Sequence, residues 1–343
     1  MKKLLNVLYV TNPNVYLSRD GENVVIKEGE NELARIPIHL LESIVAFNYL
    51  GMSPALMGLC AERGVTVSFV TEHGKFLATI HGPTSGNVLL RRQQYRLSQD
   101  VETSAMVAGW LVAAKIANCR VVLQRAIRDH GKNVDADKLR RAGDRLRDCL
   151  DRVSGCTDLS VVRGIEGEAA NVYFSSFNEL IVAQKEDFAM DGRTRRPPRD
   201  NMNAILSFLY TLLTNDMRSA LETVGLDPAV GFLHRDRPGR PSLALDLIEE
   251  LRPYLVDRLA LSLVNRKQVS SKGFEKRENQ AVSMTADTRN AIISAWQRRK
   301  QEVITHPFLK EKTQIGLLPY VQALLMARYI RGDLDAYPPF FWQ

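Results

Sequence analysis

Gly82-Pro83-Thr84-Ser85-Gly86 separates two parts of the chain that have different hydrophobic patterns. Before this stretch, short runs of Val, Ile, Leu and Tyr alternate with turn-forming residues, which is typical of β-strands. After it, apolar residues recur every three or four positions over long stretches, which is typical of α-helices. We therefore predict an α+β protein with a small β-rich domain, sandwich-like with one helix, over residues 1–81. A linker over 82–90 and a larger all-helical domain over 91–343 follow.

The β-rich part contains seven predicted strands and one helix. The helix spans Ser53–Arg63, because Ser53 can cap its N-terminus, Pro54 suits the first helical position and Gly64 follows the last turn. The predicted strands are Asn6–Val10, Val15–Leu17, Asn23–Lys27, Glu32–Ile36, Ser43–Phe47, Val65–Val70 and Phe76–Ile80.

Seven helices are predicted in the second part of the chain. They are Val101–Asp129, Ala136–Arg152, Leu159–Gln184, Met202–Thr223, Leu243–Val264 with Ser242 as N-cap, Thr288–Glu302 and Leu317–Arg331. Two polar, basic segments, Gly192–Arg199 and Val269–Arg277, are predicted to be mobile. Each is either a solvated loop or a loop that becomes ordered on a phosphate backbone.

The positive charge of the chain is concentrated in its second part. The chain has 343 residues, 45% hydrophobic and 25% charged, which excludes a disordered, collagen-like or disulfide-scaffold protein. Residues 1–85 carry 7 Lys+Arg and 8 Asp+Glu, whereas the rest carries 39 and 31, so the net charge of +7 comes from the second part. A basic domain favours an anionic partner, most often nucleic acid, although basic side chains also serve solubility alone.

The sequence carries no signal for secretion. The first ten residues have a basic tip and a short apolar run but no small-residue cleavage site, so we expect a β-strand there. No apolar run reaches about 18 residues, so we expect no transmembrane helix and no membrane partner. The four cysteines, Cys60, Cys119, Cys149 and Cys156, include no C-x-x-C pair and suit a reducing cytosol. We therefore expect a cytoplasmic protein.

A histidine and several carboxylates lie on either side of one predicted turn. His234 precedes Pro238-Gly239, and the helix that starts at Ser242 carries Asp246 and Glu249-Glu250 on the face opposite its apolar residues. Histidine combined with carboxylates is a usual ligand set for a divalent ion. The alternatives are a hydrogen-bonded structural histidine and acidic residues that face solvent or the helix dipole.

A second unusual stretch is Gly164-Ile165-Glu166-Gly167, inside an otherwise apolar helix. Each glycine costs about 1 kcal/mol relative to alanine there, so the absence of a side chain needs a reason. Either another backbone approaches the Glu166 carboxylate, or the glycines permit tight packing between helices. The sequence has no G-x-x-x-x-G-K-S/T loop, no H-E-x-x-H and no G-x-S-x-G, which leaves a divalent ion as the simplest catalytic interpretation.

Four ordered blocks of the chain resemble the CRISPR-associated spacer-acquisition integrases, and the similarity covers nearly the whole chain. The blocks are Arg91–Tyr95; Gly164–Gly167 with Ala169-Ala170 and Tyr173-Phe174; Asp200–Tyr210; and Gly231–His234 with Ser242-Leu243, Asp246–Glu249 and Arg252-Pro253. The C-terminal Tyr337–Trp342 is similar to the type I-C branch.

The resemblance implies a metal-dependent DNA endonuclease and integrase of CRISPR antiviral defence. In that reaction a 3′-hydroxyl of a short foreign DNA attacks a phosphodiester of a CRISPR repeat. By position, Glu166, His234 and Glu249 would be the catalytic ligands of Mg²⁺ or Mn²⁺, with Asp246 as a supporting acid. The resemblance also implies double-stranded and branched DNA as partners. It further implies homodimers formed through the neutral β-rich domain and a small second CRISPR-associated protein that bridges two dimers.

Further residues are candidates for DNA contacts. Arg235, Arg237 and Arg240 follow His234 and could hold phosphates, while the alternative is a solvated turn. Tyr173 and Tyr210 could stack on bases, while the alternative is a core or network role. The basic segment adds Arg193, Arg195, Arg196 and Arg199. Two other functions use the same residues: a branched-DNA repair nuclease and a nonenzymatic DNA-binding scaffold.

Overall fold

A computed structural model describes residues 7–41, 43–47, 51–71, 76–80, 87–194 and 197–342. The chain divides into two compact units, Met1–Gly86 and Asn87–Gln343. The predicted linker sequence Gly82–Gly86 lies outside the described residues, as do Asn6, Arg195 and Arg196.

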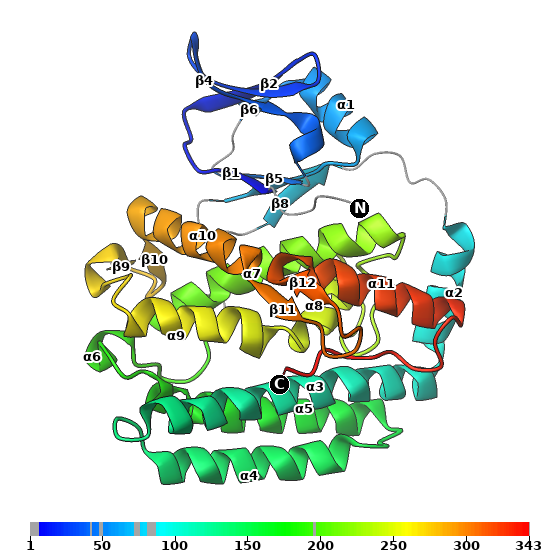
Figure 1. The fold of residues 1–343 in the computed structure, drawn as a ribbon, viewed down its shortest axis with the longest axis vertical. Helices are drawn as coiled ribbons and strands as arrows, with labels where there is room; N and C mark the ends of the chain where they lie inside the picture. The colour runs from blue at the N-terminus through cyan, green and yellow to red at the C-terminus, as the bar shows by residue number, and fades with distance from the viewer. Residues whose placement is uncertain are drawn as a thin grey trace. The chain divides into compact units, whose positions relative to one another are not determined.

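In its described residues, the N-terminal unit contains two four-stranded sheets, one α-helix and a short 3₁₀ turn, Ile38–Leu40 (Figure 1). The first sheet has the order β1 (Val7–Val10), β5 (Ser43–Phe47), β7 (Thr66–Val70) and β8 (Phe76–Ile80). The second has the order β4 (Asn31–Pro37), β3 (Asn23–Glu28), β2 (Val15–Asp20) and β6 (Gly51–Met52). The pairs β1–β5, β5–β7 and β2–β6 are parallel, and the others are antiparallel.

One apolar core holds the sheets and the helix α1 (Pro54–Arg63) together. Ile44 of the first sheet, Leu17 of the second and Leu59 of α1 are fully buried in it. The helix has the predicted caps, because Ser53 Oγ accepts a hydrogen bond from Leu56 N and Gly64 has a left-handed φ of 68°. The predicted β-rich, sandwich-like domain with one helix is confirmed.

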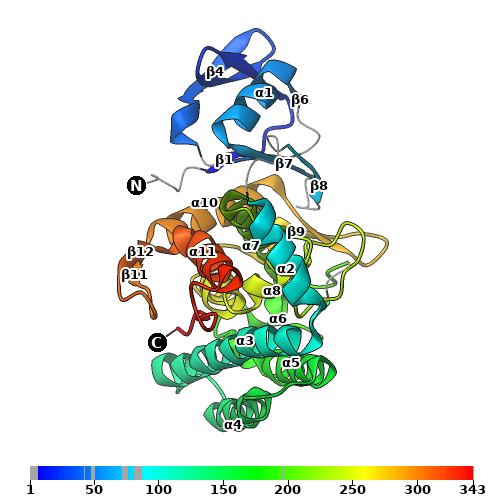
Figure 2. The ribbon, with the colours of Figure 1, turned by 90° about the vertical axis from the view of Figure 1, so that its right-hand side faces the viewer.

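The second unit is largely helical, as predicted. Its helices are α2 (Val88–Gln99), α3 (Val101–His130), α4 (Ala136–Val153), α5 (Leu159–Ser175), α6 (Lys185–Phe188), α7 (Asn201–Val224), α8 (Ser242–Glu249), α9 (Arg258–Asn265), α10 (Ala286–Gln301) and α11 (Leu318–Arg331). Figures 1 and 2 show α3, α4 and α5 packed against one another as a group, with α7, α8 and α11 in the adjoining part. The hairpins β9 (Phe274–Lys276) with β10 (Val282–Met284) and β11 (Val303–Thr305) with β12 (Lys312–Gln314) were not predicted.

The largest difference from prediction lies between residues 243 and 264, where one continuous helix was expected. Helix α8 ends at Glu249, Arg252–Asp257 form a π-helical turn, and α9 follows. Pro253 has no N–H for the helical ladder, which accounts for the interruption. The predicted N-cap Ser242 is also wrong, since Pro241 occupies that position without a side-chain cap.

Two further boundaries differ from prediction. The helix expected over 159–184 ends at Ser175, and a short 3₁₀ turn, Phe177–Leu180, follows it. Helix α2 was missed, because its sequence is polar and begins within the expected linker.

Contrary to expectation, one helix among the described residues, α3, is long and apolar enough to cross a membrane. Of its most apolar 18-residue window, 67% is buried inside the protein, as in the central helix of a folded domain. Helix α3 packs against α4 and α5.

The C-terminal segment is attached to the residue that follows α8. The buried Glu250 carboxylate accepts hydrogen bonds from Tyr337 OH, from Gln322 Nε2 at 2.8 Å and from Phe340 N at 2.6 Å. Asn118 of α3 donates to Glu250 O at 2.7 Å and to Phe340 O at 2.8 Å. These bonds link the chain end, α3 and α8.

We predict that Glu250→Ala lowers the free energy of unfolding by at least about 3 kcal/mol, because three buried donors lose their acceptor. Urea unfolding followed by tryptophan fluorescence measures this, since Trp110, Trp296 and Trp342 all lie in the helical unit. Arg331→Ala is the control, because this exposed side chain pairs with the exposed Asp333 and its loss should cost less than about 0.5 kcal/mol. Equal stability of the two variants would contradict the role given to Glu250.

Candidate active site

Two of the three predicted ligands meet at a lysine that the sequence analysis did not select. Lys115 of α3 donates to Glu166 Oε1 of α5, and its Nζ lies 2.7 Å from Glu249 Oε2 of α8. The Lys115 side chain is 8% exposed and that of Glu249 is 2% exposed, whereas that of Glu166 is 25% exposed. The carboxylates therefore share one buried positive charge, and only Glu166 reaches the surface.

The glycines beside Glu166 leave open space. A Cβ added to Gly164 or Gly167 would meet nothing within 4 Å, and both positions are exposed. Tight helix packing therefore does not explain them, and the surface next to the Glu166 carboxylate is uncovered. In the sequence, Lys115 is the single lysine of the apolar stretch Leu111–Asn118, and this was the signal that could have identified it as a site residue.

Glu249 remains ionised although it is buried. Burial opposes its charge, but the charges of Arg252, Lys115 and His234 lower the pKa of Glu249 below its ordinary value. Arg252 also donates to Glu249 Oε1 and lies over the ring of Tyr210, 4.9 Å from the ring centroid. The alternative of solvent-facing acids is wrong for α8, because Asp246, Glu249 and Glu250 are all buried.

Asp246 fixes the loop that carries His234. Its carboxylate accepts hydrogen bonds from the backbone N–H groups of Phe232 at 2.6 Å, Leu233 at 2.9 Å and His234 at 3.0 Å. The same group lies 2.6 Å from His234 Nδ1, which leaves Nε2 as the ring nitrogen available to a ligand. Gly231 permits this approach, since a Cβ there would lie 2.5 Å from Asp246 Oδ2. Asp246 thus has the geometry of a supporting acid.

The carboxylate and imidazole groups of the candidate site meet some of the requirements for binding a hard cation. Within the residues that the structure describes, no three His, Cys, Asp or Glu side chains gather as the ligands of one metal ion would. Glu166 and Glu249 do converge on one positive centre, the ammonium of Lys115. Oε2 of Glu249 is buried and receives no hydrogen bond of suitable geometry, although Lys115 Nζ is near. Two carboxylates thus fit an ion such as Mg²⁺, with His234 placed near Glu249.

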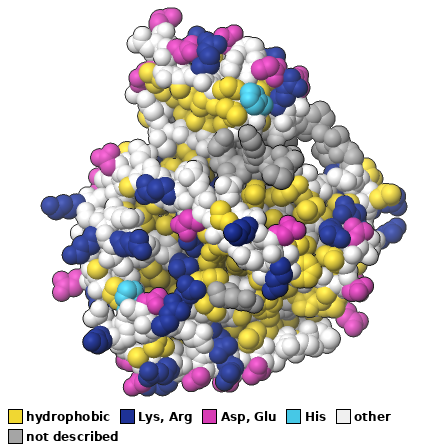
Figure 3. All heavy atoms as spheres, viewed as in Figure 1, with side chains coloured by type: hydrophobic (Ala, Val, Ile, Leu, Met, Phe, Trp, Pro, Cys, Tyr) yellow, Lys and Arg dark blue, Asp and Glu magenta, His cyan; other side chains and the backbone are white. Residues whose placement is uncertain are grey.

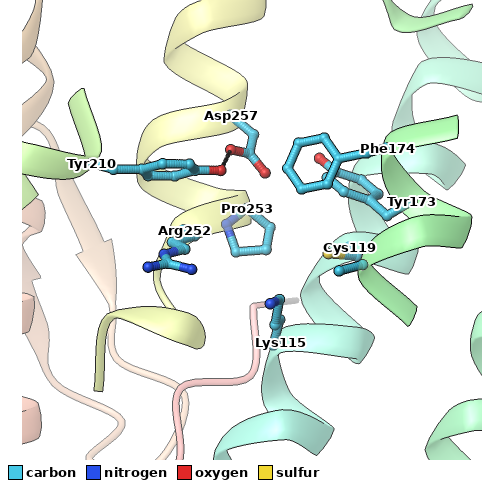
Figure 4. Close-up of a pocket in the computed structure, with 9 residues that line it drawn as sticks. Lys115, Cys119, Tyr173, Phe174, Tyr210, Arg252, Pro253 and Asp257 are labelled. Atoms are coloured by element: carbon cyan, nitrogen blue, oxygen red, sulfur yellow. Dashed lines mark hydrogen bonds between the residues drawn. The ribbon is translucent and has the colours of Figure 1, made fainter. Parts of the chain in front are cut away.

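A small pocket extends from Lys115 between α3, α5 and the π-helical turn (Figure 4). In it the hydroxyl of Tyr210 donates to Asp257 Oδ1 at 2.5 Å. Tyr173 is 1% exposed, and Arg193 and Arg252 lie over the ring of Tyr210. The structure therefore places both tyrosines in the core network, which was the alternative to base stacking.

The candidate arginines have different environments. Arg193 is not part of a mobile loop, because it donates to Asn203 Oδ1 and to Ser207 Oγ of α7. Arg199, Arg235 and Arg237 are exposed, and Arg240 is half-buried. Arg195 and Arg196 lie outside the described residues. Their contacts with DNA remain predictions.

Two solved structures share this fold over nearly the whole chain. A casposase bound to its integration product has a TM-score of 0.82 and 23% identity, over 97% of this chain and 92% of that one. A chain of a Cas6-RT-Cas1–Cas2 complex has a TM-score of 0.84 and 20% identity, over all of this chain and 36% of that one. At these identities the likeness concerns the fold alone.

Comparison of the amino-acid sequence with known proteins identifies the family of this chain. The family model described as CRISPR associated protein Cas1 matches residues 8–298. A CRISPR-associated endonuclease Cas1 of Chlorobaculum tepidum is 54% identical over 343 residues, which is the full length of both chains. The chain belongs to the Cas1 family.

We predict that Lys115→Met lowers the free energy of unfolding by about 3–5 kcal/mol, because it leaves the buried Glu249 carboxylate undercompensated. The double variant Lys115→Met with Glu249→Gln should recover much of this loss, since both buried charges are then gone. Urea unfolding in EDTA compares the two. A single variant as stable as the parent would disprove the bridging role.

We predict that Asp257→Asn changes how stability depends on pH. Burial raises the pKa of Asp257 to about 6, against the hydrogen bond from Tyr210. The other groups that face it are Tyr173, Arg193, Arg252 and Cys119. The pKa of Asp257 in the folded protein is above the unfolded value of about 3.9. Its stabilising contribution to the free energy of unfolding is therefore fully present below about pH 4 and is lost as the pH rises through 6.

We compare the free energy of unfolding of Asp257→Asn with that of the parent protein at each pH. Between pH 4 and pH 7.5 this difference should shift by about 3 kcal/mol in favour of the variant. Urea unfolding at the two pH values measures the difference. Asp333→Asn at an exposed position is the control. An unchanged pH dependence in Asp257→Asn would refute the assignment.

Proposed function

We propose that this chain is a metal-dependent DNA endonuclease and integrase of CRISPR adaptation. It would insert short foreign DNA into the CRISPR array by attack of a DNA 3′-hydroxyl on a repeat phosphodiester. The observation that carries the proposal is the convergence of Glu166 and Glu249, from two helices, on one buried cationic centre. The full-length similarity to a protein named an endonuclease supports it.

The candidate site supplies groups suited to this chemistry. Glu166, Glu249 and Nε2 of His234 would hold Mg²⁺ or Mn²⁺, which withdraws charge from a phosphate when bound. Asp246 orients the imidazole through Nδ1, and Arg252 keeps Glu249 ionised. The open surface at Gly164 and Gly167 admits a DNA backbone next to Glu166. Lys115 holds the two carboxylates in place, and its ammonium must move aside for an ion to contact both.

The partners in this proposal are double-stranded and branched DNA, a second copy of the chain, and a small second CRISPR-associated protein that bridges two dimers. The solved structures with a bound integration product and with Cas2 support the choice of DNA and of the second CRISPR-associated protein. The basic second part of the chain would contact the DNA, and the neutral N-terminal unit would form the dimer. A cytoplasmic location and the type I-C branch are further parts of the proposal.

The Lys115 bridge also suits a nonenzymatic DNA-binding scaffold, because it neutralises the carboxylates without a metal. A branched-DNA repair nuclease would use the same residues as the integrase. The integrase is favoured over the repair nuclease by the fold shared with a casposase.

We predict that Glu166→Gln, Glu249→Gln and His234→Ala each reduce Mn²⁺-dependent strand transfer on a branched substrate at least about 100-fold. Glu168→Gln is the matched control on α5, since this exposed side chain pairs with Arg152 and should retain activity. Electron paramagnetic resonance of bound Mn²⁺ should show its loss in Glu166→Gln and Glu249→Gln.

Full activity in all three variants would overturn the assignment of the catalytic residues. A parent protein that binds branched DNA but shows no strand transfer would support the scaffold. Integration into a plasmid that carries a repeat, compared with cleavage of plain branched DNA, separates the integrase from the repair nuclease. An enzyme that cleaves but never joins DNA would favour the nuclease.

A further inference from the structure

Three arginines from separate helices surround the aromatic rings near the end of the chain. The guanidinium of Arg125 on α3 lies 4.2 Å from the ring centroid of Trp342, and that of Arg258 on α9 lies 4.4 Å from it. Arg299 of α10 lies 4.9 Å from the ring centroid of the buried Tyr254. We call these three arginines with Trp342 and Tyr254 the arginine cluster. It is separate from the candidate active site.

The cluster is positively charged and short of acceptors. Within the described part of the chain, Arg125 and Arg258 form neither an ion pair nor a hydrogen bond. Arg299 pairs with Glu302, whose side chain is 54% exposed, and Nη2 of Arg299 is buried without a hydrogen-bond partner. Among the described residues, Arg299 is thus the member of the cluster with an ion pair, while the charges of Asp129 and Glu302 act on Arg125 and Arg258 without pairing with them.

The electrostatics of Arg258 agree with a missing anion. Burial and the neighbouring charges of Arg299 and Arg125 lower the pKa of Arg258 to about 10. Three cations crowded in a partly buried position repel one another, so a bound anion would stabilise them. Guanidinium groups bind phosphate oxygens in pairs, through planar forks of N–H donors.

The cluster is held in place by the rest of the fold. Trp342 N donates to Asn118 Oδ1 at 2.8 Å, and Asn118 in turn anchors Phe340 and Glu250. The indole of Trp342 thus orients the guanidinium groups of Arg125 and Arg258. Figure 3 shows Lys and Arg side chains gathered between α9 and α3 on the face that carries the end of the chain.

The position of the cluster suits a nucleic-acid strand that passes the candidate active site. Arg125 follows Lys115 by ten residues on α3, which corresponds to about 15 Å along the helix axis. Phosphates of one DNA strand recur about every 3.4 Å of helix axis, so a strand that ran parallel to α3 would span the two positions with about four nucleotides. The excess of Lys and Arg over residues 86–343 also favours a polyanion over an isolated acidic side chain.

We propose that Arg125, Arg258 and Arg299, positioned by Trp342, bind backbone phosphates of the DNA strand outside the catalytic centre. This inference rests on the proposed function, because that function supplies the DNA. The cluster would contribute affinity that does not depend on sequence, and it would fix the register of the strand.

The test measures binding of a labelled branched DNA by fluorescence anisotropy, in EDTA and at several salt concentrations. Arg125→Ala with Arg258→Ala should weaken binding at least tenfold at 0.15 M salt. It should also reduce the slope of log K against log salt by about 2. The control variant, Arg128→Ala with Arg331→Ala, also removes two positive charges, from exposed arginines that pair with Asp129 and Asp333. It should change the DNA affinity and the salt slope less.

Two further variants separate a phosphate site from a general charge effect. Arg125→Lys with Arg258→Lys keeps the charge but loses the planar forks, so affinity should fall while the salt slope is largely kept. Trp342→Leu keeps both arginines but removes the ring that orients them, so affinity should fall without a change of slope. Circular dichroism checks that each variant is folded.

The outcomes distinguish this inference from the proposed function. If the parent protein binds DNA and the double alanine variant matches the exposed-arginine control, the cluster proposal is overturned and the integrase proposal stands. If the parent protein binds no DNA, both fail. If the cluster variant loses binding to poly-glutamate but keeps DNA affinity, the site serves an acidic protein partner instead, which also overturns the proposal.

Discussion

The shared ion pair of Lys115 with Glu166 and Glu249 joins the three helices that carry the candidate site. Two carboxylates facing one buried position would repel each other and lose hydration, which costs several kcal/mol for each charge. The ammonium of Lys115 and the guanidinium of Arg252 compensate this cost. Helices α3, α5 and α8 therefore adopt a mutual arrangement that keeps the acids close together and charged, as a site for a cation requires.

Helix α8 and the residue that follows it carry three neighbouring acids with three different tasks. Asp246 holds the His234 loop, Glu249 faces Lys115, and Glu250 attaches the C-terminal segment. Asp246 and Glu250 are four residues apart and lie on the same side of a helix, so their different partners come from the surrounding elements, whereas Glu249 and Glu250 differ in direction by about 100°. The end of the chain, the histidine loop and the candidate ligand are therefore linked through two turns of one helix, and a change at one of them reaches the others.

Much of the fold was predictable because local signals agreed with it. The Ser53 cap and Gly64 mark helix ends that the structure has. The π-helical turn at Pro253, the four short strands after residue 273 and the polar helix α2 were missed, because tertiary contacts rather than periodicity define them. Within the candidate site, Glu166, His234 and Glu249 were selected from sequence, whereas Lys115 and Arg252 received no role although they neutralise the acids.

Residue types and their spacing were enough to determine the two-part architecture, the family resemblance and the acids that could bind an ion. Only the tertiary structure decided which acid faces which partner. It assigned Asp246 to backbone amides, placed Tyr173 in the core and hydrogen-bonded Tyr210 to Asp257, and brought Arg125, Arg258 and Arg299 around one aromatic pair. The reason is physical: periodicity records which side chains are apolar, but the partner of a buried charge depends on elements far apart in the chain.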